Sequence, residues 1–234
     1  MIIGAGAVAL EFASLWNAAG CEVTLLIRKD RVLSTWERRA SMTLTRELKR
    51  RGVNVIARTA VDRVDTGANL GATVHYRQGD SDEDRTAYGE VVLAAIGRVP
   101  NTDADWFRSS GLKLDERGYV TVDGYGRTNL DGVWALGDIT PGHALAHRAF
   151  EQGITIAEKI AGADPKPVID DTVPQVVFSF PEAASVGLTL DQAKAREDVV
   201  EPKETAYPML SNARMLMSGE GGSMTVVSGA FANN

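Results

Sequence analysis

The sequence predicts an α/β fold with a parallel sheet, and three observations support that class. An apolar strand at residues 1–3 runs into Gly4-Ala5-Gly6-Ala7-Val8-Ala9, and an amphipathic helical pattern follows over 10–18. A second apolar strand at 22–27 completes a β-α-β start. Residues 90–96, in which Glu90 precedes six consecutive apolar residues, are typical of a strand buried in a parallel sheet. Together these features indicate a Rossmann-like unit.

The G-x-G-x-x-A turn predicts a site for a dinucleotide. Gly4 permits the tight turn, Gly6 lets the backbone approach a pyrophosphate, and Ala9 keeps the helix close to the sheet. The helix N–H groups and the positive end of its dipole would then face the phosphates. A glycine-rich turn can also be purely structural, but the flanking strand and helix favour a ligand site. Because the first strand is so short, we expect the chain to be a piece of a longer protein.

The next elements follow from periodicity and turn residues. A loop at 28–36 leads to a charged helix at 38–51, which Gly52 ends, and to a parallel strand at 53–56. We then expect three antiparallel strands forming a β-meander, at 60–64, 73–77 and 85–88. They are separated by a turn at 67–71 and by an acidic turn at 79–84, the latter interpreted as a solvated hairpin loop rather than a metal site.

The second half of the sequence predicts shorter elements. The expected elements are strands at 119–122 and 133–136, a helix at 143–161 and a linker at 162–167. After the linker come strands at 174–178, 183–187 and 224–227. A helix over 189–195 is expected between them, capped by Thr189 or Asp191.

Composition excludes several function classes. A net charge of −6 disfavours a nucleic-acid or anionic-membrane surface, and no apolar run is long enough to span a bilayer. Cys21 is the only cysteine, so an intramolecular disulfide is excluded; we interpret it as a small apolar filler in a protein of the reducing cytoplasm. The three histidines, His75, His143 and His147, show no ligand spacing, so no metal is expected.

Four stretches closely resemble the class I flavoprotein disulfide reductases, the FAD-dependent pyridine nucleotide-disulfide oxidoreductases. They are Gly4–Ala13, Ala95–Thr102, Gly132–Asp138 and Val186–Thr189. Within that family the chain is most similar to the dihydrolipoamide dehydrogenase branch. That similarity rests on Leu10–Trp16, on Leu145-Ala146-His147-Arg148-Ala149 and on Glu151-Gln152-Gly153-Ile154.

The resemblance implies a domain division and a function. Residues 1–102 would form an NAD(P)-binding domain, 103–168 the C-terminal part of an FAD-binding domain, and 169–234 an incomplete α+β dimerisation domain. An N-terminal FAD segment and the end of the dimerisation domain are expected to lie outside the chain. The parent would be a homodimer that passes electrons between a dihydrolipoyl dithiol, FAD and NAD(P) in cell redox homeostasis. Its partners would be the lipoyl domains of a 2-oxoacid dehydrogenase complex.

The resemblance also implies roles for single residues. Glu11 would lie beside the nicotinamide, Gly97 beside the nicotinamide ribose, and Asp138 would hold a ribityl hydroxyl of FAD. Alternatives are that Glu11 is a first-turn acid and that Gly97 merely ends a strand; His147, placed near the flavin, could equally be a packed core histidine. The full predicted cofactor-binding set is Gly4, Gly6, Ala7, Val8, Ala9, Glu11, Ile27, Arg28, Lys29, Gly97, Arg98, Asp138, Leu145, Ala146 and His147.

No catalytic residue of the family is found. The C-x-x-x-x-C pair and the C-terminal His–Glu pair that the resemblance calls for are both absent from this sequence. The sequence contains part of the residues for hydride transfer between a nicotinamide and a flavin. It contains none of those for dithiol–disulfide exchange.

The choice between NAD and NADP depends on the end of the second strand. NAD-linked lipoamide enzymes usually place a glutamate there, whereas this chain has Ile27 followed by Arg28 and Lys29. Basic residues can hold the 2′-phosphate of NADPH, so NADP is slightly favoured, although the pair could be a solvated loop and Asp30 could reach a ribose. NADPH-dependent reduction of glutathione or mycothiol disulfide is therefore an alternative function. A third alternative is a dinucleotide-binding module without redox chemistry. Asp138 and residues 145–147 disfavour it, because such a module would have no reason to keep groups that contact a flavin.

Overall fold

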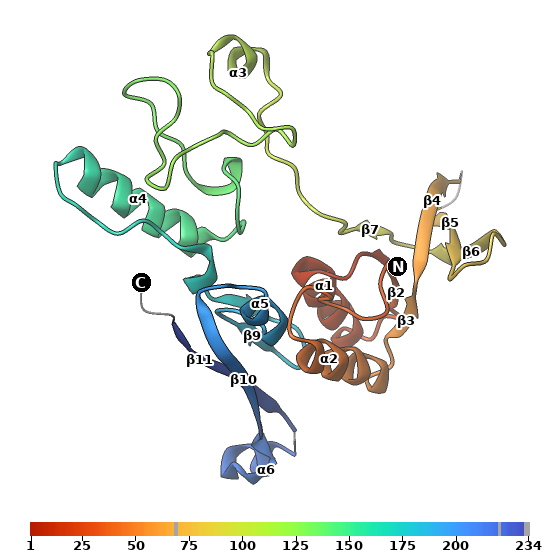
Figure 1. Cartoon of the computed structure of the whole chain (residues 1–234). Helices are drawn as coiled ribbons and strands as arrows, with labels where there is room; N and C mark the ends of the chain where they lie inside the picture. The colour runs from red at the N-terminus through yellow and green to blue at the C-terminus, as the bar shows by residue number, and fades with distance from the viewer. Residues whose placement is uncertain (68–69, 220, 232–234) are drawn as a thin grey trace. The chain divides into compact units, whose positions relative to one another are not determined.

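A computed structural model describes residues 1–67, 70–219 and 221–231, apart from the side chain of Ser211. Its contacts divide the chain into two compact units. The first comprises Met1–Ile96 with Val176–Asn234, and the second Gly97–Gln175. Figure 1 shows both units, with labels on most of their helices and strands.

A four-stranded parallel sheet forms the centre of the first unit, as the sequence predicts. Its strands are β1 (Ile2–Ile3), β2 (Thr24–Ile27), β3 (Asn54–Ala57) and β7 (Leu93–Ala94), in the order β3-β2-β1-β7. The connecting helices are α1 (Ala7–Ala18) and α2 (Arg38–Arg50). The carboxyl ends of all four strands therefore meet at one edge, which is where ligands of such sheets bind.

Each face of this sheet is covered by a different layer (Figure 1). On one face, Leu10 of α1 and Leu48 of α2 pack with Leu25 and Ile27 in a cluster that excludes water. On the other face, Ile3 and Leu26 pack against Val74 and Tyr76 of the β-meander. Burying both faces explains why β2 reads as a continuous apolar run.

The β-meander is confirmed, with β4 (Thr59–Thr66), β5 (Ala72–Gln78) and β6 (Arg85–Gly89) paired antiparallel. The acidic turn at 79–84 connects β5 and β6 as an exposed hairpin loop. The turn expected at 67–71 falls partly on residues 68 and 69, which lie outside the described residues. On the exposed surface of the meander, a hydrogen bond from Arg77 lowers the pKa of Asp62.

Two expectations about burial in this unit are wrong. Only Leu93–Ala94 of the run 90–96 form a strand, and Val91 and Ile96 are 59% and 79% exposed. The reason is that β7 is an edge strand, paired with β1 on one side only in the described structure. Cys21, expected as apolar filler, is exposed because it follows the end of α1 rather than facing the core.

The second unit contains α3 (Asp105–Ser109), η1 (Gly137–Ile139), α4 (Ala146–Ile160) and η2 (Asp170–Thr172). The strands expected at 119–122 and 133–136 are wrong: these segments make only the isolated bridges Leu114↔Val120 and Arg127↔Trp134. Asp115 and Asp123 each accept two following backbone N–H groups through one carboxylate oxygen. One of these donors, Tyr119 N, lies in the first of the two segments, so it is not available to a longer ladder there.

The C-terminal elements begin with the hairpin of β8 (Gln175–Val177) and β9 (Ala183–Ser185), near the predicted strands. α5 (Leu190–Lys194) follows with Thr189 as its cap, which decides between Thr189 and Asp191. The strand expected at 224–227 is part of the longer β11 (Ser223–Phe231). β11 pairs with β10 (Val199–Pro208), which the sequence did not predict, and η3 (Met209–Ser211) and α6 (Ala213–Ser218) lie between them. Among the described helices, none is long and apolar enough to cross a bilayer.

Candidate nucleotide-binding site

The turn between β1 and α1 requires glycine at its first position. Gly4 has φ of +140°, and a Cβ there would collide with the carbonyl oxygen of Ala95. Its N–H also donates to the Leu26 carbonyl at 3.0 Å, so the backbone is held from the β2 side as well. The first glycine of the motif is thus explained by the close approach of two neighbouring strand ends.

The N-terminus of α1 is open. Gly6 is the N-cap residue, and a Cβ built there has no atom of the described residues within 4 Å. Leu10 N donates to Gly6 O at 3.2 Å, so the N–H groups of the three preceding helical residues, Ala7, Val8 and Ala9, have no acceptor within the helix. In the described structure no side chain caps them. An anion at this point would find free donors and the positive end of the helix dipole.

The residues of this first turn divide between core and site. Ala9 is completely buried, as expected of the residue that keeps the helix on the sheet, while Val8 is exposed. Ala9 packs in the same cluster as Leu25. The small side chain is therefore a packing requirement, and the exposed side of the turn is left to a ligand.

Glu11 is held by a segment distant in sequence. Its Oε1 accepts a hydrogen bond from Phe178 N at 3.0 Å, and Ser14 Oγ accepts one from Phe180 N at 2.9 Å. The Arg51 guanidinium lies 4.5 Å from the centroid of the Phe180 ring. Glu11 is the fifth residue of α1, so its interpretation as a first-turn acid is wrong. The segment that follows β8 therefore positions this carboxylate, which sequence periodicity gave no means of finding.

The three residues predicted to bind the nucleotide at the end of β2 differ in their exposure. Ile27 is fully buried in the core, so only its backbone is available at the sheet edge. Arg28 and Lys29 are exposed, and their side chains have no hydrogen bond or ion pair with any residue that the structure describes. Asp30, the acid considered for a ribose, is instead 3.0 Å from Arg31 Nη1.

Gly97 and Arg98 follow β7 in the chain and are both exposed. Gly97 has φ of +142°, which favours glycine, and a Cβ there meets no described atom within 4 Å. The space around it agrees with a backbone that a ligand can approach, and equally with a simple end to the strand.

The predicted flavin residues gather in the second unit. Asp138 is exposed within η1, and Gly137 N donates to Gln152 Oε1 of α4 at 2.9 Å. α4 begins later than expected, so Leu145 is its N-cap and Ala146 and His147 open its first turn. His147 is exposed and its Nε2 lies 2.8 Å from Pro174 O, which contradicts a packed core histidine.

A buried arginine fixes the loop between Asp138 and α4. The Arg148 side chain is 6% exposed; its Nε lies 2.6 Å from Asp170 Oδ1 and its Nη2 donates to Pro141 O at 2.6 Å. Sequence reasoning missed this role, because Asp170 is 22 residues away. Elsewhere in the described part, no cluster of His, Cys, Asp and Glu could hold a metal ion.

The chain matches a known protein family over the part that contains the predicted nucleotide-binding and flavin-binding residues. Residues 1–153 match the profile of the pyridine nucleotide-disulphide oxidoreductases. The chain belongs to this family. The family is described by its use of a pyridine nucleotide, and the observed α/β fold with its parallel sheet is the one expected of it.

Relatives in sequence and structure come from the same family. The chain is 37% identical to a dihydrolipoyl dehydrogenase of Cupriavidus necator over 219 residues, covering 93% of this chain and 45% of that protein. It is also 37% identical to a dihydrolipoyl dehydrogenase of Geobacillus stearothermophilus, covering 92% and 45%. The structure of LpdA from Mycobacterium tuberculosis superimposes with a TM-score of 0.85 at 30% identity, covering 97% and 48%. The chain thus spans about half the length of the proteins it matches.

Proposed function

We propose that the chain is the nicotinamide-binding part, with a portion of the flavin-binding part, of a dihydrolipoyl dehydrogenase. The observation that carries this proposal is the open N-terminus of α1 behind Gly6, at the carboxyl edge of a parallel sheet. The sequence similarity to dihydrolipoyl dehydrogenases supports the specific reaction. The whole protein would transfer electrons between a dihydrolipoyl dithiol and a nicotinamide, and bound FAD would supply the redox centre between them.

In this proposal the chain's own residues bind and orient the cofactors. Free N–H groups at the start of α1 hold the pyrophosphate, and Glu11, fixed by Phe178 N, accepts a hydrogen bond from the nicotinamide carboxamide. Gly97 would lie beside the nicotinamide ribose, and Arg98 is kept in the proposed cofactor-binding set. The exposed carboxylate of Asp138 holds a ribityl hydroxyl, with residues 145–147 near the flavin.

The proposal extends to domains, assembly and compartment. Residues 1–102, 103–168 and 169–234 are assigned to nicotinamide binding, flavin binding and dimerisation. The protein would work as a homodimer with lipoyl domains of a 2-oxoacid dehydrogenase complex. A chain with a single cysteine suits the cytoplasm.

The chain itself is expected to bind a nicotinamide dinucleotide without oxidising dihydrolipoamide. Cys21 is its only cysteine, and a dithiol needs two neighbouring thiols. Calorimetric titration with NADH and NADPH tests binding, and an absorbance assay of NAD(P) reduction by dihydrolipoamide tests turnover. Failure to bind either nucleotide, or turnover by the pure chain, would contradict the proposal. In the surrounding reading frame, C-x-x-x-x-C upstream and H-x-x-x-x-E downstream would support it, and their absence would count against it.

We further propose NADPH as the preferred nucleotide. Arg28 and Lys29 are exposed, unpaired within the described structure, and placed directly after β2. At that edge a Rossmann unit binds the adenosine ribose of the dinucleotide. This chain has Ile27 there, so it offers no carboxylate to hold the two ribose hydroxyls. The same observation favours the second candidate function, an NADPH-dependent disulfide reductase.

Replacing Arg28 by alanine is expected to weaken NADPH binding by roughly tenfold to a hundredfold, because a charge-assisted hydrogen bond contributes about 1.5–3 kcal/mol. NADH binding should hardly change. Calorimetric titration of both nucleotides against both proteins measures the effect. A wild-type preference for NADH would instead make Arg28 and Lys29 a surface loop and favour the NAD-linked enzyme.

A further inference from the structure

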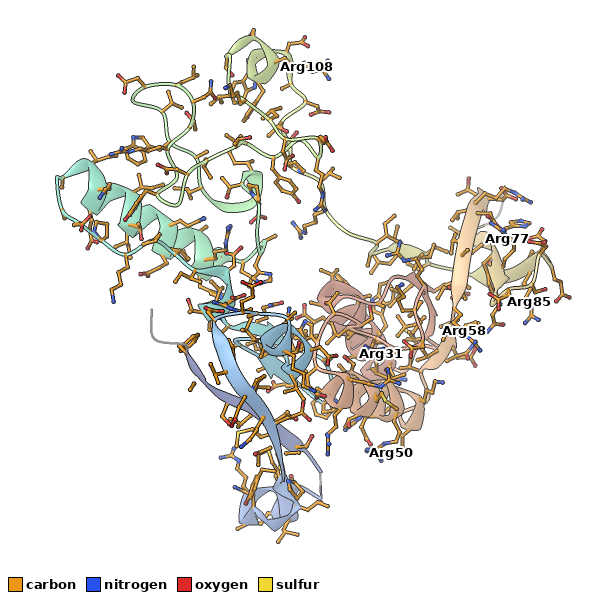
Figure 2. The ribbon with its side chains drawn as sticks, in the orientation of Figure 1. Arg31, Arg50, Arg58, Arg77, Arg85 and Arg108 are labelled. Atoms are coloured by element: carbon orange, nitrogen blue, oxygen red, sulfur yellow. The ribbon has the colours of Figure 1, made fainter. Side chains whose placement is uncertain are left out.

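Arg58 occupies an unusual backbone position between β3 and β4. Its φ is +56°, a left-handed conformation that arginine seldom adopts and that suits glycine or asparagine better. The backbone is fixed on both sides, since Arg58 N donates to Lys29 O at 3.0 Å and Gly79 N donates to Arg58 O at 2.8 Å. Figure 2 labels Arg58 at this corner. The backbone conformation is thus set by the strands, and nothing in it calls for an arginine side chain.

The register of the sheet places Arg58 beside the predicted specificity residues. Ile27 is paired with Ala57 at the end of the parallel ladder of β2 and β3, so Arg28 and Arg58 are the first residues after the ends of two neighbouring strands. Adjacent strands are about 4.8 Å apart. Lys29 is joined to Arg58 through the backbone hydrogen bond given above. Two strand ends therefore bring three cationic residues to one edge of the sheet.

These cations are not neutralised by the protein. Arg58 is exposed, and like Arg28 and Lys29 its side chain has no hydrogen bond or ion pair in the part of the chain that the structure describes. The neighbouring acid, Asp30, is engaged by Arg31. The whole chain carries a net charge of −6, so an unpaired positive cluster is a local feature and not a consequence of a basic surface. Such a cluster favours an anion.

We propose that Arg58 is a second specificity-determining residue, which contacts the 2′-phosphate of NADPH together with Arg28. The 2′-phosphate is a dianion with several acceptor oxygens, and two guanidinium groups can share it while each keeps good hydrogen-bond geometry. The carboxyl edge of β2 is where the adenosine ribose of a bound dinucleotide lies, and Arg58 is one strand further along that edge. This inference rests on the proposed NADPH preference.

The test is calorimetric titration of the full chain with NADPH, NADH and two fragments, adenosine 2′,5′-bisphosphate and AMP. Arg58→Asn should weaken NADPH and the bisphosphate by about tenfold, as expected for one charge-assisted contact at an exposed site, and leave NADH and AMP unchanged. Because asparagine tolerates a positive φ, its thermal midpoint should not fall. Arg58→Lys should keep part of the affinity.

Arg108→Asn is the matched control, since Arg108 is exposed and its side chain has no partner in the described structure, but it belongs to the second unit. It removes the same charge and should change no affinity. Equal weakening of NADPH and NADH by Arg58→Asn would overturn the inference, because it would place the side chain on the adenine or ribose. If Arg28→Ala weakens NADPH while Arg58→Asn does not, this inference alone fails. If the wild type prefers NADH, the NADPH proposal fails, and this one with it.

Discussion

Gly4→Ala is expected to lower the free energy of unfolding by roughly 2–6 kcal/mol, which is a large share of the stability of a typical domain. A side chain at a φ of +140° costs about 1–3 kcal/mol, and the added Cβ collides with the Ala95 carbonyl oxygen, for which overpacking adds about 1–3 kcal/mol. A typical domain has about 5–15 kcal/mol to lose. Urea titration followed by circular dichroism measures the difference.

Gly6→Ala is the matched control for Gly4→Ala. Its φ is −86°, and its Cβ would meet no described atom within 4 Å, so the loss should be below about 1 kcal/mol. If the unfolding midpoints of Gly4→Ala and Gly6→Ala coincide, the close approach of β1 and β7 does not explain Gly4.

Gly6→Val is expected to abolish binding of both NADH and NADPH while the chain stays folded. The extended backbone of Gly6 accommodates valine, but the branched side chain would fill the space through which a pyrophosphate reaches the free N–H groups of α1. Losing two charge-assisted hydrogen bonds, at about 1.5–3 kcal/mol each, corresponds to a loss of affinity of at least a hundredfold. Calorimetry with both nucleotides measures the loss, and the unfolding midpoint shows that the fold is kept.

This variant differs from Arg28→Ala in an informative way. Gly6→Val should affect the two nucleotides equally, because both carry the pyrophosphate, whereas Arg28→Ala should affect NADPH alone. Undiminished NADH binding by Gly6→Val would show that the nucleotide lies elsewhere, and the function proposed here would lose its main support.

The elements that sequence reasoning predicted well are those with a local signal. β1, α1, β2, α2, β3 and the meander all follow from periodicity within a short window and from glycines that end elements. The buried side chains Leu10, Leu25 and Leu48 produce that periodicity. The motif Gly4–Ala9 is likewise recognisable within six consecutive residues. The contacts that require those small residues, with the Ala95 carbonyl at Gly4 and with the cluster of Leu25 at Ala9, come from other strands.

Elsewhere the local signal competed with other requirements. Residues 119–122 have the β-branched and aromatic composition of a strand. Asp115 and Asp123 nevertheless accept nearby backbone N–H groups in turns, and only isolated bridges form. β10 was not predicted because its exposed, charged sequence resembles a loop; it forms because β11 offers a partner along its length. Strand pairing is a property of two segments, so one segment alone does not reveal it.

By itself, the sequence determined the family, the α/β class, the dinucleotide turn and the basic residues after β2. Each of these was inferred from short stretches of consecutive residues, and residues that are close in the chain are necessarily close in space. Tertiary structure alone decided that Phe178 N fixes Glu11 across 167 residues and that β7 lies at an edge. It also decided that the strands preceding Arg28 and Arg58 are neighbours in the sheet. These depend on which strands become neighbours, and that choice comes from burying both faces of the sheet at once, a condition that no short stretch of sequence expresses.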